Sequence, residues 1–232
     1  MLVLSEDRGM MQSSHKRGAG LWTKFRTDTS ISESLKKRRG ALRNALETVA
    51  TVLAVAILVL ARVSPENAIN PDGIVIHHSA FSAEDIAQFP GPIDASVIDA
   101  LHERRGFGVI CDGRTYHIAY HYVILPDGTV QSGRPEHCVG AHTLGRNNAL
   151  GICLVGNFST RANPDGRLGS ERPTKAQIRS LVSLVTALKG KYLIPCDQIQ
   201  RHQDLNPRTL CPGDRLPWTE IQTQIGCGTA GK

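Results

Sequence analysis

The chain has 232 residues, enough for one domain of ordinary size and an appendage. Its net charge of +6 arises in residues 1–43, which hold ten Lys and Arg side chains against four Asp and Glu. The remaining residues hold seventeen of each sign, so that part of the chain has no net charge with which to bind a polyanion. This distribution excludes nucleic-acid binding as the expected function.

Two N-terminal segments come first. Residues 1–43 are polar and basic without apolar periodicity, and we expect a disordered cytoplasmic arm. Residues 48–61 carry no charge, and the stretch 46–63, with Glu47 and Arg62 near its ends, reaches a spanning length. With a basic run at 36–39 ahead of it, this stretch is typical of a transmembrane or signal-anchor segment. A signal peptide cleaved after Ala61 and a buried core helix are the alternatives. The expected location is therefore the cell membrane, as a single-pass protein with the remaining chain outside the cytoplasm, or a secreted or periplasmic form after cleavage.

Strand and helix patterns alternate after a linker at residues 64–72, which contains two prolines. Residues 157–173 form a long polar loop, a candidate rim of a cleft. The pattern predicts an α/β fold, a single domain over residues 73–226 with a mixed central β-sheet flanked by helices, followed by a flexible tail at 227–232. Strands are expected at 73–78, 116–125, 129–132 and 149–155, and helices at 93–105, 174–191 (capped by Thr174) and 217–225.

The segment Arg201–Asp214 combines ligand-type side chains with turn-forming pairs. Its Asn-Pro and Pro-Gly pairs allow His202 and Cys211 to face one point. Imidazole and thiolate together suit zinc, and the best third ligand is His77, at the end of a β-branched run. Three protein ligands with a fourth position left open describe a catalytic zinc site and not a structural one.

The six cysteines need sorting into ligands, bridges and core residues. If Cys211 binds metal, at least one of the others has no partner within the chain. Cys153 lies in an apolar run and is most simply a core residue. Cys196 and Cys227 flank the segment with the proposed ligands and could pair in an oxidising compartment, although spacing cannot establish connectivity.

Five short motifs occur in a characteristic order: I-V-I-H-H-S-A, A-Y-H-Y-V-I, G-A-H-T, N-A-L-G-I-C-L-V-G-N and H-Q-D-L followed by T-L-C-P-G. With them, residues 70–226 resemble the zinc-dependent N-acetylmuramoyl-L-alanine amidases of the type 2 family. That family includes phage lysozyme-type amidases and peptidoglycan recognition proteins. The resemblance implies three kinds of site residue: the Zn²⁺ ligands His77, His202 and Cys211, the catalytic Tyr120 and Thr209, and His142 and Asn148 in the substrate groove. A structural role in a turn is the alternative for His142 and Asn148.

The resemblance also implies a function. The expected activity is cleavage of the amide bond between N-acetylmuramic acid and the L-alanine of the stem peptide, with peptidoglycan or muropeptides as partners. Hydroxyl groups of Tyr120 and Thr209 would stabilise the oxyanion, since a thiolate ligand weakens the Lewis acidity of zinc. The alternative is a binding module of the same fold that recognises muropeptides without cutting them. Non-catalytic members of the family commonly lack the Cys ligand, which this chain keeps at Cys211.

Neighbouring polar residues have structural interpretations. His78 is expected to pack or to form hydrogen bonds beside His77. Strand alternation places His117 and His121 one face away from Tyr120, in supporting roles. Asp204 either orients a ligand through a hydrogen bond or caps a turn.

A second metal cluster would need more ligands than the sequence offers nearby. His137, Cys138 and His142 are close together along the chain. No fourth ligand with suitable spacing follows them, so we do not expect a metal site there.

Overall fold

The structure is a computed structural model that describes the backbone of residues 29–62 and 67–228, and the side chains of residues 32–55 and 67–228. The chain forms two compact units, Met1–Val59 and Leu60–Lys232.

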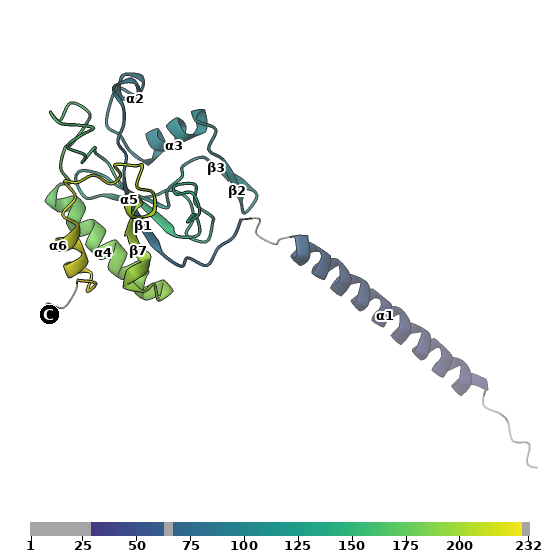
Figure 1. Cartoon of the computed structure of the whole chain (residues 1–232). Coiled ribbons are helices and arrows are strands. Elements are labelled where there is room, and N and C mark those ends of the chain that lie inside the picture. Colours follow the sequence, from purple (N-terminus) through teal and green to yellow (C-terminus); the bar gives the residue numbers. More distant parts are fainter. Residues whose placement is uncertain (1–28, 63–66, 229–232) are drawn as a thin grey trace, which may run out of the picture. The chain divides into compact units, whose positions relative to one another are not determined.

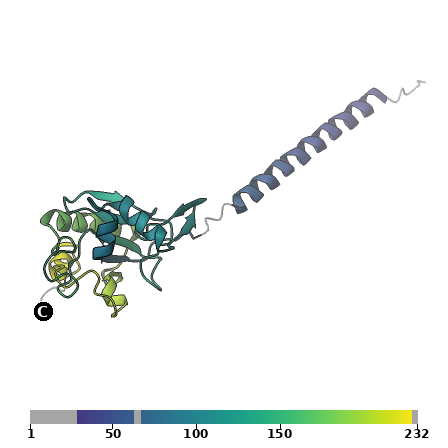
Figure 2. The ribbon, with the colours of Figure 1, turned by 90° about the horizontal axis from the view of Figure 1, so that it is seen from above.

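The described residues of the first unit belong to helix α1 (Thr29–Arg62), which is uninterrupted in both views of the molecule (Figures 1 and 2). It includes the last part of the arm that was expected to be disordered, because residues 29–43 hold strong helix formers such as Leu, Lys, Arg and Ala. Within the described part of the chain, no helix is both long and apolar enough to cross a membrane. The expected span at 46–63 lies partly outside the described side chains, which end at Val55, and it stays a prediction. Residues 1–28 of the arm lie outside the described residues.

The second unit is built on a five-stranded sheet with the strand order β5-β4-β6-β1-β7. Strand β4 is parallel to β6, β6 to β1, and β1 to β7, whereas β5 is antiparallel to β4. The predicted mixed sheet is therefore confirmed. The strands are β1 (Ile74–His78), β4 (Tyr122–Ile124), β5 (Val130–Ser132), β6 (Leu150–Leu154) and β7 (Ile199–Arg201).

Helices flank this sheet, as predicted. The core on one face packs against α4 (Lys175–Tyr192) and α6 (Trp218–Gln224), and the core on the other face against α2 (Ala83–Gln88) and α3 (Ala95–Arg104) (Figure 1). Successive side chains of a strand point to opposite faces, so Ile76 faces α4 and His77 faces away from it. Helix α4 begins at the predicted cap, because the Thr174 hydroxyl accepts a hydrogen bond from the Gln177 amide at 3.0 Å.

The segment at residues 116–125 is not the single strand that its alternation predicts. Its first residue ends β3 (Arg114–Tyr116), which forms an antiparallel hairpin with β2 (Val109–Cys111), and its later part belongs to β4. Residues 117–121 between them leave regular strand geometry. Within this stretch the Ile118 carbonyl accepts a hydrogen bond from a side chain further along the chain, Arg134, and not from a neighbouring strand.

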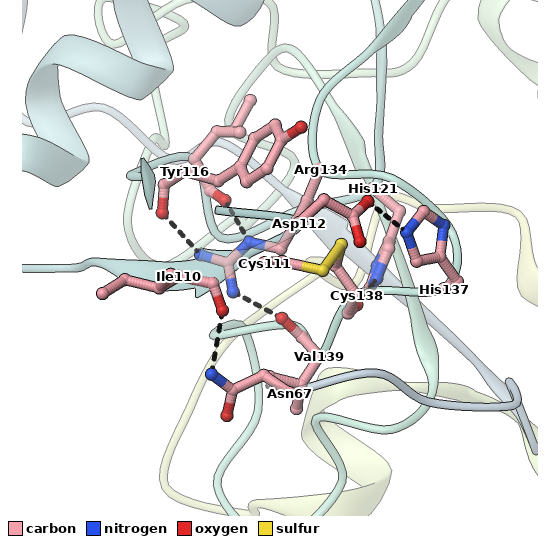
Figure 3. Close-up of a disulfide and its surroundings, with 11 residues drawn as sticks. Asn67, Ile110, Cys111, Asp112, Tyr116, His121, Arg134, His137, Cys138 and Val139 are labelled. Atoms are coloured by element: carbon pink, nitrogen blue, oxygen red, sulfur yellow. Dashed lines mark hydrogen bonds and ion pairs between the residues drawn. A yellow bond between two sulfur atoms is a disulfide. The ribbon is translucent and has the colours of Figure 1, made fainter. Parts of the chain in front are cut away.

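Arg134 is almost fully buried, with 1% of its surface exposed. Its guanidinium group donates to the carbonyl oxygens of Tyr116 (3.2 Å), Ile118 (3.0 Å) and Val139 (2.6 Å) (Figure 3). Because a buried carbonyl without a donor costs about 1–3 kcal/mol, this one side chain compensates an irregular stretch of backbone that the sheet cannot satisfy.

Two disulfide bonds join segments of the unit that lie far apart in the chain. Cys196, in the short helix η1 (Cys196–Gln198), bonds to Cys227, which confirms that pairing. The second, between Cys111 and Cys138, was not anticipated, because it joins the β2–β3 hairpin to a distant loop. Of the described residues, Cys153 and Cys211 are the unpaired cysteines. Cys153 is fully buried beside apolar side chains, as expected of a core residue.

Both boundaries of the domain differ from the expected ones. Residues 67–72 belong to the fold and not to a linker, because the Ile69 amide donates to the His137 carbonyl at 2.7 Å and Ala68 pairs with Cys138. At the other end, the disulfide of Cys227 anchors the start of the expected tail. Residues 63–66 and 229–232 lie outside the described residues.

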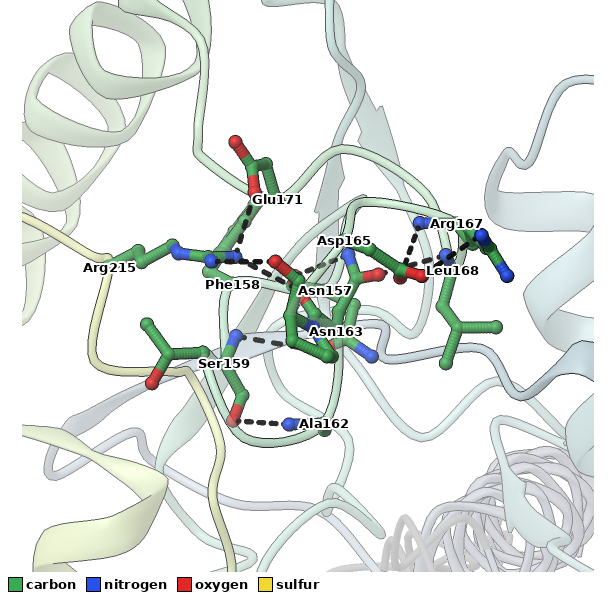
Figure 4. A network of polar contacts seen from close by, with 12 residues as sticks. Asn157, Phe158, Ser159, Ala162, Asn163, Asp165, Arg167, Leu168, Glu171 and Arg215 are labelled. Carbon is green, nitrogen blue, oxygen red and sulfur yellow. Dashed lines mark hydrogen bonds and ion pairs between the residues drawn. The ribbon is translucent and has the colours of Figure 1, made fainter.

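The polar loop at residues 157–173 has no regular secondary structure, as predicted, but a buried side chain organises it. The Asn163 side-chain amide donates to the carbonyl oxygens of Asn157 (3.1 Å) and Gly169 (3.0 Å) (Figure 4). Arg215 then holds the loop from outside, through the Asn163 carbonyl at 3.0 Å and the Glu171 carboxylate at 3.1 Å. The loop is thereby fastened to the segment that carries Cys211.

Three buried histidines support the fold by accepting backbone hydrogen bonds at Nδ1. The donors are the amides of Phe158 for His78 (3.0 Å), Ala119 for His102 (3.0 Å) and Gly151 for His121 (2.9 Å). Burial lowers the pKa of each of these imidazoles to about 4. Each ring is therefore neutral at pH 7, which is the form that can accept at Nδ1.

We expect these histidines to make the fold sensitive to acid. An unfolded chain binds protons on its histidines below about pH 6.5, whereas the folded chain binds them only near pH 4, so acid favours unfolding. The stabilisation is complete above about pH 6.5 and is lost as the pH falls towards 4, by at most about 1.4 kcal/mol per pH unit for each histidine. Chemical denaturation between pH 7 and 4, with a chelator present, measures this loss.

Two variants serve as a matched pair for this measurement. His102→Gln removes one of the three titrating rings and is expected to reduce the pH slope. His117→Gln replaces a half-buried histidine whose Nδ1 contacts the Phe107 carbonyl oxygen and not a backbone amide, and it serves as the control for the substitution itself. A free energy of unfolding that does not change between pH 7 and 5 would contradict the assignment.

Candidate active site

Three chain segments meet at the C-terminal end of β1. His77 is the fourth residue of this strand, and the helix α5 (His202–Leu205), which directly follows β7, contacts β1 (Figure 1). Because β1 and β7 are parallel neighbours, their C-terminal ends lie side by side and bring His202 next to His77. The two imidazole rings have centroids 4.6 Å apart.

Cys211 completes the cluster from the turn-rich segment after α5. Its Sγ lies 3.5 Å from His77 Nδ1 and accepts a hydrogen bond from the His78 amide at 3.3 Å. One ligand atom from each of His77, His202 and Cys211 lies within 4.8 Å of the others. The structure therefore brings together the three residues that the sequence analysis named as zinc ligands.

The protonation of this cluster suits a divalent cation. Burial, with smaller effects from neighbouring imidazoles, lowers the pKa of His77 well below its ordinary value, and burial also lowers the pKa of His202. Both rings are therefore neutral and offer lone pairs. Burial raises the pKa of Cys211 to about 12, so without a cation the thiol keeps its proton. A metal ion supplies the positive charge that would release this proton, and two imidazoles with one thiolate are a donor set that zinc accepts.

A chain of hydrogen bonds selects the nitrogen of His77 that faces this cluster. His142 Nε2 lies 2.9 Å from the Ala149 carbonyl oxygen, which can only accept, so this nitrogen carries the proton. Burial lowers the pKa of His142 to about 3, so its ring is neutral and its Nδ1 is an acceptor. His77 Nε2, 3.0 Å away, then donates to it. The lone pair of His77 is left on Nδ1, the nitrogen that faces Cys211.

Two glycines, Gly140 and Gly151, leave the space that the His142 ring occupies. A Cβ atom at Gly151 would lie 2.5 Å from His142 Cδ2, and one at Gly140 would lie equally close. The backbone of the His142 turn is held by Asn147, whose Oδ1 accepts from the amides of His142 and Thr143 at 2.9 Å each. This role of Asn147 depends on the shape of the turn, so no motif in the sequence predicts it.

Tyr120 and Thr209 border the cluster. The Tyr120 ring lies 5.1 Å from the His77 ring, and burial raises the pKa of its hydroxyl well above the ordinary value, so it remains a proton donor. The Thr209 oxygen accepts from the Cys211 amide at 3.2 Å, which leaves its hydroxyl proton free for another acceptor. Both side chains can donate hydrogen bonds to a negatively charged oxygen.

A cleft of about 440 Å³ is lined by Thr209 and by the chain neighbours of His202 and Cys211, Gln203 and Leu210. Thr209 and Gln203 line it on one side, and residues 159–161 on the other. The prediction that the polar loop forms the rim of a cleft is thus confirmed.

Asn148 does not join this cluster. It is exposed, and its side-chain amide donates to the Asp72 carboxylate at 2.5 Å. His142 lies at the cluster, but its polar contacts are with His77, the Thr143 hydroxyl and backbone groups. The two residues expected to line the substrate groove are therefore not brought together.

The neighbouring polar residues have the supporting roles expected of them. His78 points to Phe158, on the other side of the sheet from His77, and His121 is held between backbone groups. Asp204 caps its turn: its carboxylate accepts from the Arg201 amide at 2.9 Å and from the Arg201 guanidinium. The other alternative, a hydrogen bond from Asp204 to a metal ligand, is not observed among the described residues.

Comparisons with known proteins agree with this geometry. The profile of the family described as N-acetylmuramoyl-L-alanine amidase matches residues 67–214. The endolysin of Escherichia phage T7 is 31% identical over 163 residues, which cover 69% of this chain and 93% of the endolysin. The endolysin of Klebsiella phage KP32 is 36% identical over 105 residues, covering 44% of this chain and 64% of that protein, slightly less than two thirds.

A solved structure points the same way. The N-acetylmuramoyl-L-alanine amidase LysC from Clostridium intestinale URNW is 34% identical with a TM-score of 0.52, covering 68% of this chain and 87% of that one. The matched region of the family profile contains all three candidate ligands and more than half of the chain. The chain therefore belongs to the type 2 N-acetylmuramoyl-L-alanine amidase family, as the motifs indicated.

Proposed function

We propose that this protein is a zinc-dependent peptidoglycan amidase that cleaves the bond between the lactyl group of N-acetylmuramic acid and the L-alanine of the stem peptide. The observation that carries the proposal is the convergence of His77, His202 and Cys211, whose ligand atoms lie within 4.8 Å of one another beside a cleft. When bound, zinc supplies Lewis acidity towards the scissile carbonyl and acidifies water.

The chain's own residues have three tasks in this reaction. His142 holds His77 in the tautomer whose Nδ1 faces the metal position. The Tyr120 hydroxyl, which stays protonated, and the Thr209 hydroxyl both donate hydrogen bonds to the oxyanion that develops at the carbonyl. The cleft between the polar loop and the segment after α5 excludes bulk water from part of the substrate, which strengthens these hydrogen bonds.

Digestion of purified peptidoglycan by the full chain tests the proposal. With zinc present, mass spectrometry should find released stem peptides that begin with L-alanine, together with intact glycan strands. A chelator should stop the release, and added zinc should restore it. Cleavage at a glycosidic or peptide bond, or unchanged peptidoglycan with zinc present, would contradict the proposal. Binding of muropeptides without cleavage would favour the alternative, a recognition module of the same fold.

A variant of His142 separates two roles that this residue could have. If it positions His77, His142→Ala should weaken zinc affinity by roughly 10–100-fold, the usual cost of losing a hydrogen-bond partner of a metal ligand. Competition with a fluorescent chelator measures this affinity, and His117→Ala serves as the control, since that ring lies against the Phe107 carbonyl. Unchanged zinc affinity with weaker muropeptide binding would instead support the substrate-groove role that the resemblance implied.

We also propose, from the sequence alone, a single-pass membrane location with the amidase domain outside the cytoplasm. The supporting features are the uncharged stretch Thr48–Ala61 and the basic run at 36–39 ahead of it. Fractionation of cells carrying a C-terminal tag should give full-length protein in the membrane. A soluble exported form that starts near Arg62 would show that the segment is a cleaved signal.

A further inference from the structure

A second group of metal-ligand side chains lies at the Cys111–Cys138 disulfide. Next to the two cysteines are Asp112 and His137, whose Oδ2 and Nε2 atoms are 2.6 Å apart (Figure 3). One donor atom from each of the four residues lies within 4.8 Å of the other three. No metal site was expected around His137 and Cys138, because no further ligand with suitable spacing follows them in the sequence. The β2–β3 hairpin brings two further potential ligands, Cys111 and Asp112, next to them.

The hairpin turn explains the position of the carboxylate. Asp112 and Gly113 have φ angles of 52° and 71°, the left-handed conformation at both central residues that a tight hairpin requires. Asp-Gly is a preferred pair for this turn. The turn leaves the Asp112 side chain exposed next to His137, while the cysteine before it is buried against the domain.

Contacts besides the disulfide hold the two halves of this group together. The Asn67 side-chain amide donates to the Ile110 carbonyl at 2.9 Å and so fixes the hairpin (Figure 3). On the other side, the Cys138 carbonyl accepts from His121 Nε2 at 2.8 Å, and the Cys138 amide donates to the Pro135 carbonyl at 3.0 Å. Opening the sulfur–sulfur bond therefore leaves both backbone segments anchored.

We propose that these four residues are a redox-gated metal site: reduction of the disulfide creates a site for Zn²⁺ with two thiolates, one imidazole and one carboxylate. Zinc prefers four donors of this kind in tetrahedral geometry. Bonds of about 2.3 Å to sulfur and about 2.1 Å to nitrogen and oxygen place pairs of donors roughly 3.3–3.8 Å apart. The present donor spacing, within 4.8 Å, needs only side-chain rotations to reach that arrangement.

The two states exchange by a balanced reaction. A dithiol reductant gives two electrons and two protons, its own sulfurs form a disulfide, and the bond between Cys111 and Cys138 becomes two thiols. Zinc then displaces both thiol protons into solvent. Its bonds to Asp112 and His137 replace the hydrogen bond between these two side chains. In the oxidised state the sulfurs cannot act as thiolates, so that state offers only Asp112 and His137. His137 and Asp112 are each about half exposed, so an ion can enter from solvent.

Zinc content of the purified full chain tests the proposal. The protein is incubated with zinc before and after treatment with a phosphine reductant, which holds zinc weakly, and unbound metal is removed by gel filtration. Reduction should add one zinc ion per chain, whatever the oxidised chain binds at His77, His202 and Cys211. The test is therefore independent of the proposed amidase site.

Two double variants identify the ligands. Asp112→Ala with His137→Ala should abolish the added zinc ion. Glu103→Ala with His117→Ala removes another histidine–carboxylate pair, with 3.6 Å between Nε2 and Oε1, and should retain the added ion.

Thiol alkylation gives a second measurement at single residues. In the reduced chain, zinc should slow alkylation of Cys111 and Cys138 and leave Cys196 and Cys227 unprotected, as read by peptide mass spectrometry. No added zinc after reduction, an added ion that survives the Asp112 and His137 substitutions, or unfolding of the reduced chain would each overturn the proposal.

Discussion

Replacement of Cys211 by serine is expected to abolish zinc binding and amide hydrolysis while the domain stays folded. The Sγ atom lies 3.5 Å from His77 Nδ1, and a serine hydroxyl is a poor zinc ligand at neutral pH. Two imidazoles alone hold zinc weakly. Losing a side chain that only hydrogen-bonds to a metal ligand costs roughly 10–100-fold in activity, and losing a ligand itself should cost more. Cys211 forms no disulfide, and the cleft is built by other residues, so muropeptide binding should persist. Zinc analysis, thermal unfolding and the peptidoglycan digest measure the three properties.

The chain offers a matched control in its other unpaired cysteine. Cys153 is also buried but belongs to the apolar core, so Cys153→Ser should keep zinc and lose about 1–3 kcal/mol of stability for a buried hydroxyl. A Cys211→Ser protein with stoichiometric zinc and full activity would remove this residue from the site. Loss of the fold together with the metal would assign Cys211 to the core instead.

Arg134→Ala should be among the most destabilising single substitutions in the domain. Its guanidinium group is the hydrogen-bond donor for the carbonyl oxygens of Tyr116, Ile118 and Val139. Each carbonyl left without a donor costs about 1–3 kcal/mol, so we expect the free energy of unfolding to fall by at least about 3 kcal/mol. Chemical denaturation monitored by circular dichroism measures this change.

Arg167→Ala is the control for this experiment. Arg167 is exposed and pairs with Asp165 at 2.9 Å, so its loss should cost no more than about 0.5 kcal/mol. If Arg134→Ala cost as little as the control, the irregular stretch at residues 117–121 would not depend on the buried guanidinium.

The parts of the fold that the sequence predicts are those whose signals are local. Helix α4 has apolar residues at helical spacing and a capping threonine at Thr174, and the buried strands β1 and β6 are short apolar runs. The error at residues 116–125 has a distant cause. Its alternating pattern is that of a strand. The carbonyl oxygens of Tyr116 and Ile118 accept hydrogen bonds from Arg134, which lies on another segment, and a local sequence pattern cannot predict this contact.

In the candidate site, too, some residues can be predicted from local sequence signals and others depend on the folded structure. His77, His202 and Cys211 follow from residue type and motif, since zinc ligands are few in kind. The positioning role of His142 depends on which of its nitrogens meets the Ala149 carbonyl, and this is fixed only by the folded turn. The pairing of Cys111 with a cysteine 27 residues away likewise depends on how the hairpin lies against the domain, which spacing does not reveal.

The separation of the ligands along the chain has a consequence during protein synthesis. His77 and Cys211 are 134 positions apart, and strand β1 sits in the sheet between β6 and β7, which both come later in the chain. At translation rates of about 5–20 residues per second, the ribosome adds Cys211 roughly 7–27 s after His77. Until Cys211 has been added, the nascent chain lacks one of the three candidate metal ligands, although both neighbours of β1 have by then been made. The proposed metal site is therefore completed late in synthesis, after every strand of this sheet.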